Sequence, residues 1–335
     1  NMKYDKTNAE DKALNLFADM MIEKIENVSS NWQQPWFTNG FQEWPKNLNG
    51  REYNGMNALM LMFLCEKKGY SISRFCTFDC IQRLNQSENN SENPQRVSIL
   101  KGEKSFPILL VIFICVNKDT KEKIKWEEYK KLSDTEKEKY DLFPRTRVFR
   151  VFNVAQTNIK QSRPELWQKL VNESNAKEIF NTNDSFSFAP MDKMIREQRW
   201  ICPINTVYGN SAFFSISKNE IVVPQKEQFK DGESFYTNLF HEMAHSTGHE
   251  TQLARLKKTS FGSADYAREE LVAELTAALT ATRYGMAKHI KEDSASYIKS
   301  WLKSLKEDAQ FIKTTLFDVK RASRMLNEHI DAMTV

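Results

Sequence analysis

Two histidines separated by three residues, the first of them a glutamate, constrain this chain more than any other feature of its sequence. Residues 240–250, FHEMAHSTGHE, hold three of the five histidines and include His241, Glu242 and His245 in an H-E-x-x-H pattern. On a helix, residues four apart lie on one face, so both imidazoles can bind a single Zn²⁺ ion. Glu242 is then placed to take a proton from a water on that ion. The pattern predicts a helix that carries a hydrolytic metal site.

A catalytic metal needs a third protein ligand, and REELVAEL, residues 268–275, offers the best candidate. Glu270 and Glu274 lie four apart among apolar side chains, where two carboxylates repel each other unless a cation is close. We expect Glu270 to bind the metal and Glu274 to accept the N–H of a ligating histidine, with the reverse assignment left open. Glu269 is expected on another face, in contact with solvent.

His249 is the alternative third ligand. The metzincin pattern H-E-x-x-H-x-x-G-x-x-H is matched as far as Gly248, but the next histidine comes two residues too early. His249 is therefore expected in a loop at the edge of the site. The sequence does not decide which side chain would stabilise an oxyanion, and the candidates are Tyr208, Tyr266 and His249.

Strand and helix signals surround the motif. Residues 211–224, SAFFSISKNEIVVP, predict a hairpin, which is either part of the core or an edge along which an extended peptide can pair. Asp231 or Ser234 can cap the motif helix, and Gly248 can end it. A further helix is predicted over 266–284, and two amphipathic helices follow it.

Residues 1–160 mix helices with strands. Apolar spacing predicts helices over 10–28 and 56–67, and the stretch SRFCTFDCIQRLN predicts a short one. VSILKGEKSFPILLVIFICV predicts a strand, a turn and a buried strand, and RTRVFRVFNVAQTNI predicts another strand. The highly charged segment between these strands is expected to be a solvated excursion on a hairpin, and SENNSENPQR is expected to be a surface loop.

Composition is that of an ordinary soluble protein, with 40% hydrophobic and 27% charged residues. The longest apolar run, FPILLVIFICV, is shorter than the about 20 residues that a membrane helix needs, and the first residues hold no apolar signal-peptide core. The five cysteines are scattered, which predicts reduced thiols in a cytoplasmic protein. The net charge of +4 lies in residues 1–160, which carry 25 basic and 21 acidic side chains, and it supports a polyanionic partner only weakly.

Aromatic, amide and basic side chains gather in the N-terminal half. Single-stranded nucleic acid is held by aromatic side chains that stack on bases beside a basic track. The KGEK stretch is a turn that can present two ammonium groups to a phosphate. Equally, the tryptophans can be core residues and KGEK an ordinary hairpin turn. The candidates for DNA contact are Trp36, Arg51, Tyr53, Asn54, Lys101 and Lys104.

Several stretches resemble the ArdC-type antirestriction proteins, a family with an N-terminal single-stranded-DNA-binding domain and a C-terminal zincin-like metallopeptidase domain. The C-terminal matches are AFFSISKNEIVVPQKEQF, FHEMAHSTGHETQLAR, YAREELVAELTAAL and ASYIKSWLKSLKED, and the N-terminal matches are YNGMNALML, LKGEKSFPILLVIF and VFNVAQT. The resemblance covers nearly the whole chain. SENNSENPQR and the charged segment 117–144 are additions to the pattern.

We therefore predict an α+β protein with a mixed α/β, single-stranded-DNA-binding-like domain over 1–160 and a zincin-like metallopeptidase domain over 161–335. The resemblance implies a cytoplasmic antirestriction-like protein of mobile genetic elements that binds single-stranded DNA. Its gluzincin-like site would use Zn²⁺, or Mn²⁺, to hydrolyse peptide bonds in a protein or peptide that the sequence does not identify. The alternative is a DNA-binding protein that blocks restriction enzymes sterically and uses its metal only to hold its fold.

Overall fold

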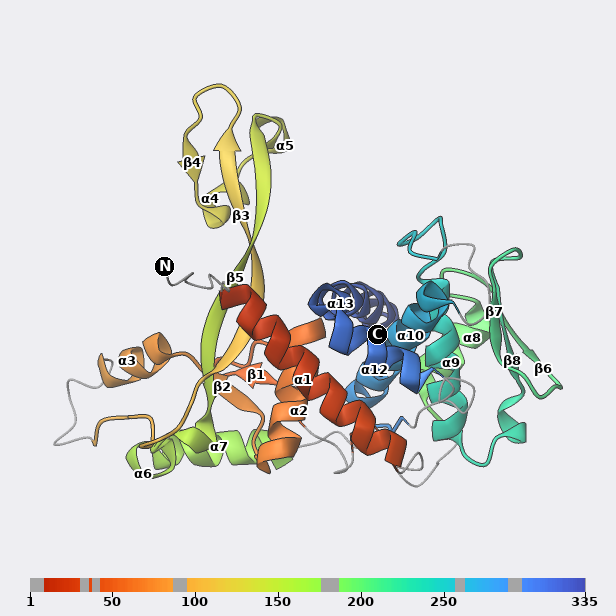
Figure 1. Ribbon diagram of the computed structural model, residues 1–335, viewed down its shortest axis with the longest axis horizontal. Helices are drawn as coiled ribbons and strands as arrows, with labels where there is room; N and C mark the ends of the chain where they lie inside the picture. Colours follow the sequence, from red (N-terminus) through yellow and green to blue (C-terminus); the bar gives the residue numbers. More distant parts are fainter. Residues whose placement is uncertain are drawn as a thin grey trace.

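The computed structural model describes residues 9–30, 36–37, 43–86, 95–175, 187–256, 263–288 and 297–334. Its elements form one elongated body from which a two-stranded arm projects (Figure 1). The N-terminal sheet lies at one end of the body and the second, smaller sheet at the other, with long helices between them (Figure 1). Most of the loop predicted by SENNSENPQR, residues 87–94, falls outside the described part of the chain.

The N-terminal half is built on a five-stranded sheet in the order β1-β2-β5-β3-β4. Its longest pairing joins β3 to β5 in an antiparallel register that runs from Phe106 opposite Val151 to Asn117 opposite Tyr140. The apolar run FPILLVIFICV is therefore a strand, as predicted. The strands are β1 (Lys46–Asn47), β2 (Arg74–Cys76), β3 (Phe106–Asn117), β4 (Lys123–Ile124) and β5 (Tyr140–Asn153).

The helices of this half follow the predicted apolar spacing. The second of them ends where Gly69 takes a φ of 67°, a left-handed conformation that glycine adopts without strain. The prediction for SRFCTFDCIQRLN was wrong in its first part, because Arg74–Cys76 pair with neighbouring strands before the helix begins. The helices and helical turns are α1 (Ala9–Ser30), α2 (Gly55–Lys68), α3 (Phe78–Gln86), α4 (Trp126–Tyr129), α5 (Asp134–Lys137), η1 (Val154–Gln156), α6 (Ile159–Ser162) and α7 (Pro164–Asn175).

Strands β3 and β5 extend beyond the sheet as the projecting arm, which carries the charged segment between them (Figure 1). Within the arm, the Trp126 ring of α4 lies 4.8 Å from the Phe113 ring of β3 and stacks on Tyr129 at 5.3 Å. This aromatic cluster covers one face of the hairpin and holds the excursion in place. The prediction of a charged excursion on a hairpin is confirmed.

The C-terminal half combines a three-stranded sheet, in the order β6-β8-β7, with helices, of which α9, α10 and α13 are the longest described. The predicted hairpin is β7 with β8, and β6 adds a parallel strand beside β8 that the sequence did not indicate. Among the described helices, none is long and apolar enough to cross a membrane. The elements are α8 (Ala189–Glu197), β6 (Ile204–Val207), β7 (Phe213–Ser215), β8 (Glu220–Pro224), η2 (Lys226–Gln228), α9 (Gly232–Ser246), α10 (Ala264–Arg283), α12 (Ile298–Glu307) and α13 (Ala309–Asp331).

One apolar core joins the two halves. Buried side chains of α1, α2 and β3 pack in the same cluster as buried side chains of α10, α12 and α13, and α1 runs alongside the C-terminal helices (Figure 1). Ion pairs reinforce the contact, with Lys313 2.6 Å from Glu10 and Arg283 2.8 Å from Glu52. The predicted domain limit at residue 160 falls inside α6. Because the N-terminal and C-terminal halves share this core, they are packed as a single body.

Candidate metal centre

Helix α9 carries both histidines of the motif on a buried face. It begins after Asp231, whose carboxylate accepts the backbone N–H of Ser234 at 2.7 Å, which selects one of the two predicted caps. The helix ends at Ser246, close to the predicted Gly248. A Cβ at Gly248 would lie 2.8 Å from Cγ of Leu256, so the close approach of the following turn requires glycine there.

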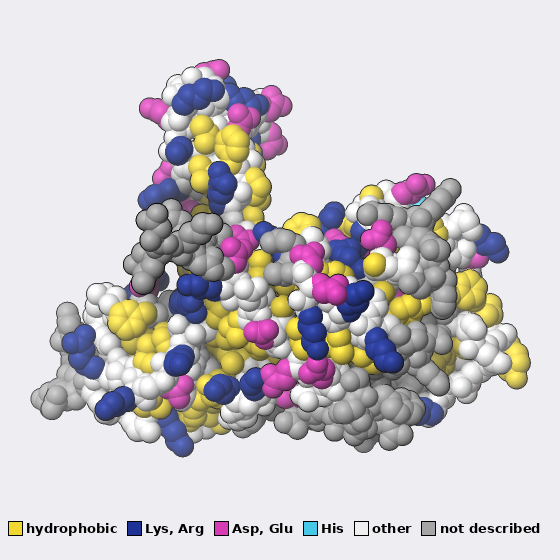
Figure 2. Space-filling view, in the orientation of Figure 1, with side chains coloured by type: hydrophobic (Ala, Val, Ile, Leu, Met, Phe, Trp, Pro, Cys, Tyr) yellow, Lys and Arg dark blue, Asp and Glu magenta, His cyan; other side chains and the backbone are white. Residues whose placement is uncertain are grey.

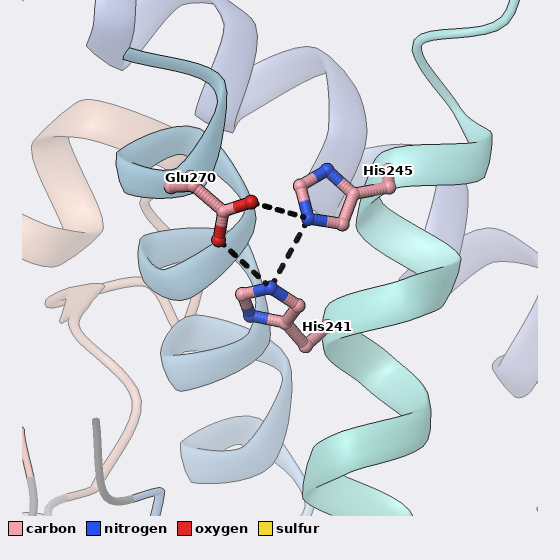
Figure 3. Close-up of side chains that lie close together, drawn as sticks. All are labelled: His241, His245 and Glu270. Carbon is pink, nitrogen blue, oxygen red and sulfur yellow. Dashed lines mark hydrogen bonds and ion pairs between the residues drawn. The ribbon is translucent and has the colours of Figure 1, made fainter. Parts of the chain in front are cut away.

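Helix α10 packs against α9 and brings Glu270 up to the two histidines (Figure 3). The two imidazole Nε2 atoms of His241 and His245 are 3.1 Å apart. The Glu270 carboxylate oxygens lie 3.5 Å from Nε2 of His241 and 3.6 Å from Nε2 of His245. Across the described ranges of the chain, these three residues form the one group of His, Cys, Asp and Glu side chains arranged to hold a metal ion.

The three side chains fit a metal ion in chemistry and in spacing. Two imidazoles and a carboxylate are a ligand set of catalytic zinc sites. Ligand atoms about 2.05 Å from Zn²⁺ at tetrahedral angles are about 3.3 Å from one another. The two Nε2 atoms here are 3.1 Å apart, each lies 3.5–3.6 Å from a different oxygen of Glu270, and one ligand atom from each residue can be chosen with all three within 4.8 Å. The side chains of His245 and Glu270 remain 14% and 10% exposed, so the cluster is open to solvent on one side.

The other ring nitrogens of the histidines face two further carboxylates of α10. Oε1 of Glu274 lies 3.3 Å from Nδ1 of His241, an ion-pair distance, although the contact does not have the geometry of a hydrogen bond. Oε1 of Glu269 lies 3.1 Å from Nδ1 of His245. Because Glu274 contacts the side of the ring opposite Glu270, the arrangement favours Glu270 over Glu274 as the third ligand.

The prediction that Glu269 lies on a solvated face was wrong. Its side chain is 13% exposed, and its carboxylate accepts two hydrogen bonds from Arg255, each at 2.9 Å. Burial raises the pKa of Glu269, but the guanidinium of Arg255 and the contact with His245 outweigh burial and hold the pKa below its ordinary value. The carboxylate is therefore charged where it meets the imidazole.

The cluster favours a positive charge between its carboxylates. Burial lowers the pKa of His241, but its contacts with Glu270 and Glu274 outweigh burial and raise that pKa to about 9. The same electrostatic arrangement that stabilises a proton on this imidazole stabilises a metal cation in its place.

Tyr266 contacts the ligand candidate Glu270, and Glu242 directly follows His241 in α9. Glu242 is 2% exposed, and its charge raises the pKa of both His241 and Tyr266. Burial, the charge of Glu270 and a hydrogen bond with it raise the pKa of Tyr266, so its hydroxyl stays protonated as a donor. The site thus holds a carboxylate that can accept a proton and a hydroxyl that can donate one.

The remaining site candidates lie elsewhere. His249 is 8% exposed, its Nδ1 lies 2.9 Å from the Thr251 hydroxyl, and its ring packs edge-on against Phe214. It lies outside the three-residue cluster. Tyr208 is 85% exposed just beyond β6.

The DNA-contact candidates do not converge on one point. Arg51 and Asn54 are exposed near β1, whereas Lys101 and Lys104 are exposed before β3. Strands β2 and β5 lie between β1 and β3, so β1 and β3 are about 14 Å apart. Tyr53 is half-buried against the core. Figure 2 shows basic side chains spread over this end of the molecule and along the arm, with acidic ones among them.

The base-stacking role predicted for Trp36 was wrong. Its side chain is 0% exposed and packs in the core that joins the two halves. Its indole N–H points to Oε2 of Glu274, 3.4 Å away. A ring with both faces covered by protein has none to offer a base.

Sequence reasoning also missed Arg255 and Lys288 as parts of the site's surroundings. Lys288 is 4% exposed, and its Nζ lies 3.2 Å from Oε2 of Glu274. Both residues follow their helices in loop segments whose path no periodicity predicts. The sequence signal that could have indicated them is the group of three carboxylates in REELVAEL, because acidic side chains that are removed from water need cationic partners.

The fold and the site define a zincin-like domain joined to a second α/β unit. Residues 191–316 match the family of zincin-like metallopeptidases, and residues 11–152 match the N-terminal domain of the anti-restriction factor ArdC. The chain therefore carries both domains of the ArdC-type antirestriction proteins, which confirms the resemblance seen in its motifs.

Solved structures agree with this fold. The metal-free crystal structure of the antirestriction protein ArdC from plasmid R388 has a TM-score of 0.67 at 23% identity, with 95% of this chain and 98% of that chain covered. The Mn(II)-bound structure of the same protein has a TM-score of 0.63 at 23% identity, with 94% and 98% covered. The α+β fold predicted from the sequence is confirmed.

Curated sequences extend the relationship. Two DNA primases TraC of Escherichia coli are 26% and 24% identical over 309 and 308 residues, which is 87% of this chain. The chain spans only 18% and 25% of the length of these primases. The uncharacterized protein y4eC of Sinorhizobium fredii is 26% identical over 300 residues, with 88% of this chain and 84% of that protein covered.

Proposed function

We propose that the chain is a metal-dependent hydrolase of peptide bonds. The observation that carries this proposal is the group of His241, His245 and Glu270, whose ligand atoms all lie within 4.8 Å of one another, with the charge of Glu242 acting on His241. We assign Zn²⁺ as the ion, because a site of two imidazoles and one carboxylate suits it, and Mn²⁺ as the alternative.

Four side chains besides the ligands have roles in the proposed hydrolysis. When bound, the ion would lower the pKa of a water and polarise the scissile carbonyl. Glu242 takes the proton of the attacking water and delivers it to the leaving amine. Tyr266 donates its hydroxyl hydrogen toward the oxygen that becomes negative in the transition state. Glu269 and Glu274 keep the two imidazoles oriented with Nε2 toward the ion.

The hairpin before α9 supplies a substrate edge. Strand β7 is at the margin of its sheet, paired on one side to β8 and close to α9. An extended peptide can add to such an edge through backbone hydrogen bonds. Phe213 and Ile216 are 46% and 52% exposed there, which provides apolar contacts for peptide side chains.

A comparison of wild type with one variant distinguishes a hydrolytic role of the metal from a purely structural role. Glu242→Gln should retain stoichiometric metal and lose cleavage of an unstructured protein such as casein, whereas wild type cleaves it. Metal content is measured by mass spectrometry after dialysis. If wild type holds the metal and cleaves no member of a broad peptide library, the steric alternative replaces this proposal.

We also propose that the N-terminal half binds single-stranded DNA, in support of an antirestriction role on mobile DNA. The support is the match to the ArdC N-terminal domain and the exposure of Arg51, Asn54, Lys101 and Lys104. The arm adds further basic side chains, Arg145 and Arg147, both of them exposed. Direct competition on the full chain between a single strand and its duplex tests this, and a preference for duplex would contradict it.

A further inference from the structure

The carboxylate of Glu274 is the centre of a buried cluster that reaches beyond the metal site. One of its oxygens, Oε1, lies 3.3 Å from Nδ1 of His241. The other, Oε2, lies 3.2 Å from Nζ of Lys288 and 3.4 Å from the indole nitrogen of Trp36. The side chains of Glu274, Trp36 and Lys288 are 0%, 0% and 4% exposed.

The two donors on Oε2 come from distant parts of the chain and are joined to each other. The backbone N–H of Trp36 donates to the carbonyl of Lys288 at 2.9 Å. Trp36 precedes the N-terminal sheet, whereas Lys288 follows α10. Trp36, a residue of the N-terminal half, therefore contacts the Glu274 carboxylate, which faces His241 of the metal site.

The geometry points to Trp36 and Lys288 as positioning residues that set the metal affinity of the site through Glu274 and His241; this inference rests on the proposed metal site. A buried carboxylate is stable only when hydrogen-bonded or paired with a cation. With Oε2 engaged by the ammonium group and the indole N–H, Oε1 is directed at His241. An imidazole that donates its Nδ1–H to such a carboxylate is held in the tautomer and orientation that present Nε2 to a metal.

Removal of either donor should free the carboxylate to turn away from His241. The ring would then lose its fixed orientation, while His245 and Glu270 remain in place. We expect Trp36→Phe and Lys288→Met each to weaken Zn²⁺ binding by about 10-fold, in the range found for groups that orient metal ligands. Lys288→Arg keeps a cation and should restore most of the affinity.

The measurement is Zn²⁺ affinity of the full chain by competition with a chromophoric chelator, with Co²⁺ absorption as a second report on the ligand geometry. Matched controls are Trp44→Phe, which removes an indole N–H that donates to the Tyr53 carbonyl at 2.7 Å, and Lys24→Met, which breaks a half-buried pair with Glu66. Neither control touches Glu274, so both should bind Zn²⁺ as wild type does.

A double-mutant cycle decides whether the effect passes through Glu274. Trp36→Phe should weaken Zn²⁺ binding in the wild-type chain and change it little in a Glu274→Gln chain. An equal loss in both backgrounds would show a general effect of the tryptophan and overturn the inference, as would unchanged affinity in both single variants. If Lys288→Met does not fold, the Trp36→Phe cycle still decides. A wild-type chain without Zn²⁺ affinity would contradict the proposed metal site itself. That outcome is distinct from the failure of the inference about Trp36 and Lys288.

Discussion

Oε1 of Glu269 lies 3.1 Å from Nδ1 of His245, on the side of the ring opposite the Nε2 that faces Glu270. Glu274 stands in the corresponding place behind His241. Helix α10 thus supplies one carboxylate between the two rings and one behind each of them. Such contacts fix the tautomer and the orientation of metal-binding histidines.

The motif residues should separate metal binding from catalysis. His241→Ala or His245→Ala should abolish stoichiometric Zn²⁺ in the full chain, because two remaining ligands hold the ion poorly. Glu242→Gln should keep the ion, since that side chain is a proton acceptor and not a ligand. Metal analysis after dialysis against a weak chelator gives the answer. Loss of metal from Glu242→Gln with retention in His241→Ala would reverse the assignment.

The third ligand is tested by Glu270→Ala against His249→Ala. The Glu270 change should release the metal, and the His249 change should leave it, because His249 is engaged with Thr251 and Phe214 outside the cluster. Zn²⁺ affinity is compared after circular dichroism has verified that both variants are folded. Equal losses, or a larger loss in His249→Ala, would favour a metzincin-like ligand set.

Arg255 should stabilise the fold by balancing the charge of Glu269. Its side chain is 4% exposed and pairs with Glu269, so Arg255→Met leaves a buried carboxylate without its cation. Breaking a buried pair from one side costs about 3–5 kcal/mol of unfolding free energy. The double variant Arg255→Met, Glu269→Gln should be more stable than Arg255→Met alone in urea unfolding. A double variant no more stable than the single one would show that the pair is not the reason.

Trp36→Ala should destabilise the chain and not impair DNA contact directly. Removing a fully buried aromatic side chain costs about 3–5 kcal/mol, because a cavity replaces it. Urea unfolding measures this destabilisation. At a temperature where the variant is folded, its affinity for a single strand should match that of wild type. A stable variant that no longer binds DNA would restore the stacking role.

The basic turn before β3 should contribute to DNA binding through its ammonium groups. Lys101→Ala with Lys104→Ala should lower the slope of log affinity against log salt by about 0.7 for each phosphate that is no longer neutralised on a single strand. Lys218→Ala, an exposed lysine on the β7–β8 hairpin, is the matched control. An unchanged slope in the double variant would remove this turn from the DNA surface.

The parts of the fold that the sequence predicted are those with strong local signals. The apolar stripe of α1, the glycine after α2 and the β-branched run of β3 each indicate their structure through nearby residues alone. Strand β6 was missed because the strand that it pairs with, β8, comes later in the chain, after β7. Strand β2 was missed because its three residues pair with β1 and β5, which are not its neighbours in a local hairpin.

The site was predicted in the same uneven way. His241, His245 and Glu270 follow from spacing within two helices, and the structure brings them together. Glu269 was misplaced because its partner Arg255 lies in the turn after α9, and helical position alone does not report such a partner. Trp36 was misassigned because a tryptophan in a polar, turn-rich stretch gives no sign of the core that covers it.

The shared core has a consequence for the order in which the chain folds. The pair Lys313 with Glu10 links residues 303 positions apart, and α1 packs on α12 and α13. On a ribosome that adds about 5–20 residues per second, α1 waits about 15–60 s before its partners emerge. The part of its apolar face that packs on α12 and α13 has no native cover during that interval, whereas α2, β3 and β5 can already cover the rest. Synthesis of the N-terminal half therefore leaves one apolar strip of α1 exposed, and the last helices complete both the core and the protection of the first helix.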